Sequence, residues 1–512
     1  MTSATSTRRL SPLDGSFLRL DTQQSPMHVG WSAVFGAPGD GPRPTAEAMR
    51  ALAAGRLHEV PWCRWRLAGA PLGLSEPRWI DDADFDLAAH IVQLTSPNDR
   101  VSDETFEVLR STVLSTPLDR ARPLWQVFLV PRLHDGRVGM IGKIHHALVD
   151  GMAALQIVKL FIDSDPGAQP RSPARWRPAG RGGAAGWAMD AARYAVSDGI
   201  GALRAGTEVV AHPRSSVAAA ARGAKLIAAA VADDVLPPAP ASQLNARIGT
   251  RRTLVGYHAP RALLRAARGR GGTLNDVGLT AVAGALRTLE LRRAEPPVEA
   301  LKAMVPVSMR RIGEEDAGNQ IAMVYMPLPI HLATSGERLE YVREQTARLK
   351  HTDRPEATQA FVQAAGLVPP PLRTPVVRAL ATPRQFNLTV SQSPAPRGSL
   401  YLLGCELEEV YSVVPIAQGH ALAIGMVRYR NELFFGCYAD PLALPEVHTL
   451  PGLLEGELEQ LASAAAATRG GPAARVTAGV PAAVTAAAGT SPAGTSRNGH
   501  SHANVRALTP AG

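Results

Sequence analysis

Two adjacent histidines in the stretch GRVGMIGKIHHALVDG (136–151) are the residues of this chain best suited to acid–base chemistry. The apolar residues before them predict a strand over 137–145, and neighbouring side chains on a strand point to opposite faces. His145 and His146 therefore cannot share one task. A neutral imidazole accepts a proton near pH 7 when its other nitrogen is held by a hydrogen bond. His146, where the strand meets a loop, is the candidate general base.

Asp150 and Gly151 follow this pair and belong to the same candidate site. Asp150 is expected to brace the loop by pairing with an arginine, and Gly151 lets the backbone turn without a side chain. A metal site is not expected, because adjacent residues on opposite faces make poor joint ligands and no HxxxH or HxxE spacing follows. From these residues alone, a catalytic and a structural histidine pair both remain open.

The elements that must position this site alternate between strands and helices. Before the histidines, the pattern predicts strands over 29–35 and 124–131 and a helix over 102–115. The helix from 274 to 293 is expected to begin with Asn275 or Asp276 as its cap. The remaining expected elements are strands over 301–310, 322–330, 386–392, 421–430 and 432–439, a hairpin turn at Arg430-Asn431, and a helix over 447–467.

The length of 512 residues predicts two domains. Composition places a Pro- and Arg-rich segment and two Ala-rich helices between them. The expected parts are a flexible N-terminus (1–9), an α/β domain with the histidines (10–165), a linker with crossover helices (166–249), a second α/β domain (250–468) and a disordered tail (469–512).

The net charge of +9 comes almost entirely from arginine and is attributed to a GC-rich coding bias. No zinc-finger spacing or alternation of aromatic and basic residues occurs, so nucleic-acid binding is not expected. The three scattered cysteines predict a reducing compartment, with each thiol buried. No secretory signal and no stretch of about 20 apolar residues are found. Residues 185–234 are expected to dock on a membrane or to pack between the domains.

HHALVDG matches HHxxxDG, the signature of acyltransferases with a chloramphenicol acetyltransferase-like fold and of peptide-synthetase condensation domains. Further stretches, in the expected order, resemble the bacterial wax ester synthase/diacylglycerol acyltransferase family across about 10–460. These stretches are LSPLDGSFLRLDTQQSPMHVG (10–30), RPLWQVFLV (122–130), LNDVGLTAVAGALR (274–287), VPVSMR (305–310) and GNQIAMVYMPLP (318–329).

The resemblance implies two chloramphenicol acetyltransferase-like α/β domains that face each other across a central tunnel, with His146 near its middle. His146 is then the general base, His145 supports the strand, and Asp150 is a structural anchor whose partner is expected to be Arg310. Acyl-CoA is a co-substrate, and neither a cofactor nor a metal is needed. The other substrate or oxyanion candidates that the matched stretches carry are Asn275, Asp276, Trp125 and Ser308.

The implied reaction transfers a long-chain acyl group to diacylglycerol or a fatty alcohol, in the cytoplasm, at the inner membrane or a lipid droplet. No protein partner is predicted. The usual SNxPGP-like segment of the family reads SQSPAP (391–396) here, which puts the acceptor preference in doubt. Two alternatives stay open: an HHxxxDG enzyme for another hydroxyl acceptor, such as a glycolipid or a natural product, and a catalytically weak lipid-binding or droplet-coating protein.

Overall fold

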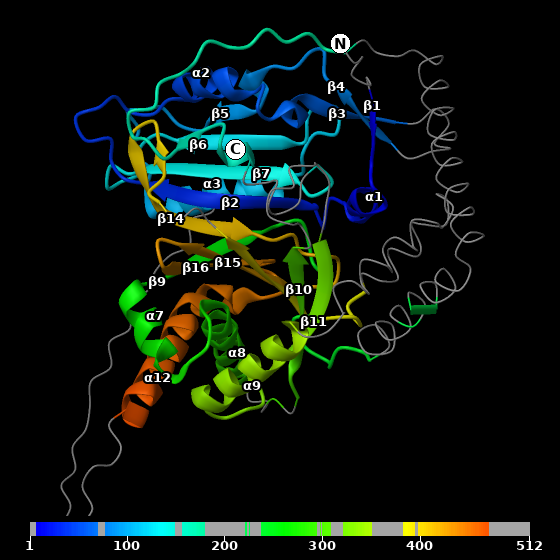
Figure 1. Cartoon of the computed structure of the whole chain (residues 1–512), viewed down its shortest axis with the longest axis vertical. Coiled ribbons are helices and arrows are strands. Elements are labelled where there is room, and N and C mark those ends of the chain that lie inside the picture. Colours follow the sequence, from blue (N-terminus) through cyan, green and yellow to red (C-terminus); the bar gives the residue numbers. More distant parts are fainter. Residues whose placement is uncertain are drawn as a thin grey trace, which may run out of the picture. The chain divides into compact units, whose positions relative to one another are not determined.

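Two large β-sheets and the helices beside them make up most of the part of the chain that the structure, a computed structural model, describes (Figure 1). The described residues are 7–69, 77–148, 156–179, 221, 222, 225, 237–293, 297, 299–308, 321–350, 382–394 and 398–469. All of them belong to one compact unit that ends at Arg469. The architecture confirms the expected α/β class with two sheet-rich halves.

The first sheet has seven strands in the order β5-β6-β7-β2-β14-β13-β8. β5 and β6 are parallel, and the other neighbours are antiparallel. In chain order, its strands are β2 (His28–Phe35), β5 (Ile91–Gln93), β6 (Trp125–Val130), β7 (Val138–His145), β8 (Ile162–Asp163), β13 (Tyr401–Leu402) and β14 (Cys405–Val413). Every residue of β7 is buried, so the strand that leads to the histidines is a central strand.

The second sheet has six strands in the order β11-β10-β12-β15-β16-β9. β12 runs parallel to both of its neighbours, and the remaining pairs are antiparallel. Its strands are β9 (Thr253–Ala259), β10 (Leu301–Ser308), β11 (Ile321–Leu328), β12 (Leu388–Pro394), β15 (Leu422–Tyr429) and β16 (Glu432–Ala439). The expected β15–β16 hairpin is confirmed, and both turn residues, Arg430 and Asn431, have the positive φ of a tight two-residue loop.

A small third sheet, β1-β4-β3, consists of β1 (Thr7–Arg9), β3 (Trp65–Ala68) and β4 (Arg78–Asp81). Residues 7–9 were expected to be flexible, but they pair with β4. The α-helices are α1 (Pro12–Leu20), α2 (Ala46–Arg56), α3 (Asp103–Ser115), α7 (Arg261–Ala267), α8 (Leu274–Arg292), α9 (Ser335–Lys350) and α12 (Leu450–Arg469). Short 3-10 helices cover Pro61–Arg64, Leu87–Ala89, Arg268–Arg270 and Pro445–Thr449.

Helix α8 begins at Leu274, as expected, but its cap is not one of the two residues predicted. Its N-cap is Thr273, whose hydroxyl accepts the backbone N–H of Asp276, while the Asp276 carboxylate accepts the N–H of Thr273 at 2.7 Å. This capping box corrects the prediction that Asn275 or Asp276 caps the helix. The helices α7, α8, α9 and α12 gather beside the six-stranded sheet (Figure 1) and share its apolar core.

Strand β14 joins the two halves of the chain. It comes from the second half, yet it pairs with β2 in the first sheet and packs against β15 and β16 of the second. Gly425 and Gly436 make this approach possible, because a Cβ at either position would collide with Ser412 of β14. The expected domain boundaries stay a prediction. Within 166–183, the described residues 166–179 contain no helix or strand, as expected for a linker.

Candidate active site

The two histidines lie where β7 ends in a tight turn. His145 is the last residue of the strand, and its carbonyl accepts the N–H of Leu148 at 2.9 Å. Its ring also takes part in the turn, because Nδ1 accepts the backbone N–H of Ala147 at 3.0 Å. His146 lies within this turn, which two hydrogen bonds to His145 close. The ring of His145 therefore helps to shape the backbone that carries His146.

His145 itself is buried, with 2% of its surface exposed. Since Nδ1 accepts a hydrogen bond, the neutral ring carries its proton on Nε2. That nitrogen faces the carboxylate of Asp21 at 3.7 Å. Burial alone would raise the pKa of Asp21, but the His145 imidazole, the Met27 amide and the Arg120 guanidinium lower it to about 2. Asp21 is therefore ionised at neutral pH.

His146, by contrast, is only half-buried. Its ring stacks on Phe17 of α1 with centroids 4.0 Å apart and planes 6° from parallel. Its backbone N–H donates to the carbonyl of Met27 at 2.9 Å. The ring plane and the backbone of His146 are thus both held by residues of the first 30 positions, and part of the side chain stays accessible.

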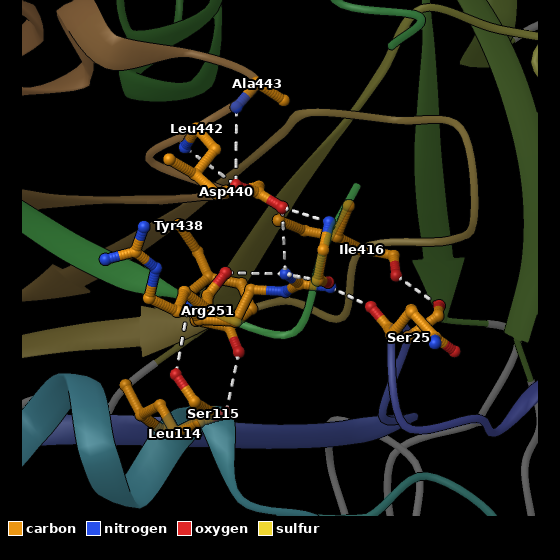
Figure 2. A network of polar contacts seen from close by, with 12 residues as sticks. Ser25, Leu114, Ser115, Arg251, Ile416, Tyr438, Asp440, Leu442 and Ala443 are labelled. Atoms are coloured by element: carbon orange, nitrogen blue, oxygen red, sulfur yellow. Dashed lines mark hydrogen bonds and ion pairs between the residues drawn. The ribbon is translucent and has the colours of Figure 1, made fainter. Parts of the chain in front are cut away.

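The loop from Asp21 to Met27 is fixed to the second half of the chain by the polar network that Figure 2 shows. The Ser25 hydroxyl donates to the carbonyl of Ile416 at 2.6 Å. The Arg252 guanidinium donates to the carbonyl of Gln24, and it lies 3.5 Å from the carboxylate of Asp440. The Arg252 and Asp440 side chains are both buried, so this cross-link is shielded from water.

Two further titratable groups lie beside the pair. The Lys143 ammonium donates to the carbonyls of Val113 and Thr116, at 3.0 and 2.7 Å, where helix α3 ends. This contact satisfies carbonyls that the helix leaves unpaired. Burial lowers the pKa of Lys143 to about 8. His28 lies directly across the sheet from His145, and burial, with help from Lys143, lowers its pKa to about 3.

The other candidate site residues lie in the core, at the start of helix α8 or outside the described residues. Trp125 is fully buried, and its indole N–H donates to the carbonyl of Cys63 at 2.7 Å, so it packs in the core. Asp276 holds the start of α8 and also accepts a hydrogen bond from Thr346 at 2.7 Å. Asn275 is half-buried in the first turn of that helix.

Several expectations fall on residues that the structure does not describe. These are Asp150, Gly151, Arg310 and nearly all of 185–234, while of Ser308 only the backbone is described. The proposed Asp150–Arg310 pair and the membrane-docking segment therefore stay predictions. The three cysteines are buried, as expected.

Sequence reasoning missed the residues that hold the histidines: Phe17, Asp21, Met27, Arg120 and Arg252. The first three lie in the stretch 10–30, which had contributed only to the family resemblance. The signal available in the sequence was that Phe17, Asp21 and Met27 all lie in the short stretch before strand β2. Among the described residues, no group of three or more potential metal ligands is found, and no helix is long and apolar enough to cross a membrane.

Solved structures with the same fold define the class of protein. The wax ester synthase/diacylglycerol acyltransferase from Marinobacter aquaeolei VT8 superposes with a TM-score of 0.62 and 24% identity, covering 90% of this chain and 100% of that one. The first condensation domain of the calcium-dependent antibiotic synthetase gives a TM-score of 0.57 at 17% identity, covering 91% and 97%. The chain thus has the fold of these two solved proteins.

Sequence comparisons give the family. Residues 10–278 match the wax ester synthase/diacylglycerol acyltransferase catalytic domain, and 317–462 match the WS/DGAT C-terminal domain. The probable diacyglycerol O-acyltransferase tgs1 of Mycobacterium tuberculosis is 30% identical over 438 residues, or 84% of this chain and 90% of the relative. The chain belongs to the wax ester synthase/diacylglycerol acyltransferase family, and it is an acyltransferase.

Proposed function

We propose that the protein transfers a long-chain acyl group from acyl-CoA to the hydroxyl of diacylglycerol, with His146 as the general base. The observation that carries the proposal is the contrast between the two rings of the HHxxxDG motif. His145 is buried and uses Nδ1 to hold a turn, whereas His146 is half-buried and held by a stacked ring and one backbone hydrogen bond. Fixed orientation with partial access is what a general base requires.

In the proposed reaction, an imidazole nitrogen of His146 takes the proton of the acceptor hydroxyl as its oxygen attacks the thioester carbonyl carbon. The tetrahedral adduct then expels the CoA thiolate, which receives the proton from the imidazolium. The new bond is an ester C–O bond and the broken bond is the thioester C–S bond. Because the acceptor oxygen attacks the thioester directly, the proposed reaction forms no covalent acyl-enzyme, and none of its steps uses a cofactor or a metal.

Diacylglycerol is the proposed acceptor because the relatives that match most of this chain carry that activity in their names. A long-chain fatty alcohol is the second acceptor, since the family name covers both products. Both acceptors and both products partition into lipid, so we place the enzyme in the cytoplasm at the surface of the inner membrane or of lipid droplets. In the atypical segment, Gln392 stands where the family usually has Asn, and it lies half-buried on β12, paired with Met426 of β15. Ala395, which replaces the usual Gly, lies outside the described residues.

The test is an assay with radiolabelled palmitoyl-CoA and either diacylglycerol or hexadecanol, run on the wild type, His146→Ala and His145→Ala. Loss of a general base lowers the rate by about 10²–10⁴-fold, and the expected loss for His145→Ala is smaller because that ring acts through the turn. His134→Ala is the matched control, since this exposed histidine lies in the turn before β7 and pairs with Asp103 of α3 at 3.1 Å.

Three outcomes would contradict the proposal. A fully active His146→Ala variant would exclude the base. Equal losses in folded His145→Ala and His146→Ala variants would exclude the division of roles. A wild type that hydrolyses no acyl-CoA and esterifies neither acceptor, but binds lipid vesicles, would support the lipid-binding alternative instead.

A further inference from the structure

Asp21 connects all three contacts that hold His146, one through its backbone and two through its carboxylate. Asp21 follows helix α1 as its C-cap residue, and its backbone N–H donates to the carbonyl of Phe17 at 3.0 Å. Its side chain accepts the N–H of Met27 at 2.8 Å and faces Nε2 of His145 at 3.7 Å. Phe17, Met27 and His145 are the residues that set the ring plane, the backbone and the turn of His146. We propose that Asp21 is a positioning residue for the base, an inference that rests on the proposed function.

The route through His145 is the most direct. A carboxylate beside Nε2 favours the tautomer with its proton on that nitrogen, which leaves Nδ1 as the acceptor for the N–H of Ala147. If the ring rotated or changed its tautomer, the amide of Ala147 would lose its partner in a buried place. The turn that carries His146 depends on this hydrogen bond. The charge of Asp21 therefore acts on the base indirectly, through the neighbouring residue His145.

The route through Met27 fixes the other side of the same backbone. The carboxylate oxygen Oδ1 of Asp21 holds the N–H of Met27, and the carbonyl of Met27 holds the N–H of His146. The peptide units on both sides of Met27 therefore take part in this chain of contacts, and Met27 cannot shift without breaking one of the two hydrogen bonds. Arg120 stabilises the arrangement, since its guanidinium donates to Oδ2 of Asp21 at 2.7 Å and to the carbonyl of Leu18 at 2.9 Å.

A purely structural role would explain the same hydrogen bonds but makes a different prediction. An ion pair that only stabilises the fold changes the melting temperature and leaves the turnover of each folded molecule unchanged. Removal of a positioning carboxylate lowers kcat while the KM for acyl-CoA stays the same, because ground-state binding does not depend on the orientation of the base. It also changes the pH profile, since a negative charge near the base favours the imidazolium. The charged or titratable side chains that face Asp21 or its partner ring are Arg120, His145, His28 and Lys143.

The experiment measures kcat, KM, the pH profile of kcat/KM and the melting temperature of Asp21→Asn and Asp21→Ala. Outer partners that orient functional histidines are worth about 10–100-fold where they have been removed at metal sites, and a loss of that size in kcat is expected here. The acid limb of the pH profile should move to lower pH in Asp21→Asn. Asp21→Glu should recover part of the activity because it restores the charge.

Asp135→Asn is the matched control. It also removes a carboxylate that is paired with an arginine, Arg137, at 2.6 Å, but it lies in the turn before β7, at the opposite end of the strand from the histidines. Its kcat should equal that of the wild type. If both Asp21 variants fail to fold, Arg120→Ala takes their place, and an unchanged kcat in that variant overturns the proposal.

Failure of this inference and failure of the proposed function give different results. An active wild type with equally active Asp21 variants overturns the inference alone. A wild type that transfers no acyl group to either acceptor overturns the proposed function. In that case a crystal structure of Asp21→Asn decides the inference: a rotated His145 ring and a displaced His146 support it, and unchanged rings refute it.

Discussion

Acid should destabilise this protein through His28, and His28→Leu should remove that weakness. His28 begins β2 and has 1% of its surface exposed. Within the described part of the chain neither ring nitrogen makes a hydrogen bond, although the backbone of Leu114 lies beside the ring. Burial, then the positive charge of Lys143, then the neighbouring His145 lower the pKa of His28 from its ordinary value of 6.5 to about 3.

These values set the size and sign of the effect. Between pH 6.5 and about 3, the unfolded chain binds a proton on His28 that the folded chain excludes. The stability that the neutral ring contributes is therefore present above pH 6.5 and is lost as the pH falls toward 3. Each pH unit in that window is worth about 1.4 kcal/mol, so acidification from pH 7 to pH 5 should cost the wild type about 2 kcal/mol through His28 alone.

Urea unfolding at pH 7, 6 and 5 measures this difference. The free energy of unfolding of the wild type should fall by about 2 kcal/mol more than that of His28→Leu over this range. His420, whose pKa burial lowers to about 4, contributes to both proteins and cancels in the comparison. His134→Leu, which removes an exposed imidazole, should follow the wild type. Parallel pH profiles for the wild type and His28→Leu would refute the reasoning.

Three substitutions test the packing that supports the site, each by thermal or urea unfolding. Gly142→Ala should destabilise the protein by about 1–3 kcal/mol, because a Cβ there collides with the indole of Trp31, and unchanged stability would contradict this close approach. Arg252→Met should cost about 3–5 kcal/mol by leaving the carboxylate of Asp440 buried without its cation, and the double variant with Asp440→Leu should recover part of the loss. Asn431→Val should cost about 1–2 kcal/mol, because a β-branched residue is strained at a φ of 65°, whereas Asn431→Gly should not.

Much of the fold was predictable because its signals are local. The strand before the histidines, helix α3 with its Ser102 cap and the β15–β16 hairpin all lie within two residues of their expected positions. Each is encoded by a short stretch of periodic apolar residues or by turn-forming residues. The cap of α8 was also readable, since Thr273 and Asp276 have the spacing of a capping box.

The strand β14 was not expected, and its sequence explains why. CELEEVYSV carries three glutamates, which disfavour strands, and a bulge between Leu407 and Glu409 interrupts its pairing with β2. Its place in the sheet of the other half depends on contacts between residues far apart in the chain. No local pattern contains that information.

The candidate site was likewise predictable only in part. The motif identified His146 as the base candidate, and the period-2 pattern separated it from His145. The residues that hold both rings could not be derived, because Asp21 and Arg120 meet only after α1, β2 and β7 have packed. A carboxylate's partner is set by tertiary structure, so the sequence alone offered Asp150 as the nearest acid.

The position of β14 has a consequence for the synthesis of this protein. A ribosome produces β2 and β7 long before β14, the strand that covers the free edge of β2. Until then the nascent chain presents an unpaired, largely apolar strand edge of the kind that promotes aggregation. Chains that terminate before β14 are therefore exposed to chaperones and proteases, and the histidine turn reaches its final surroundings only after Ile416 has been made.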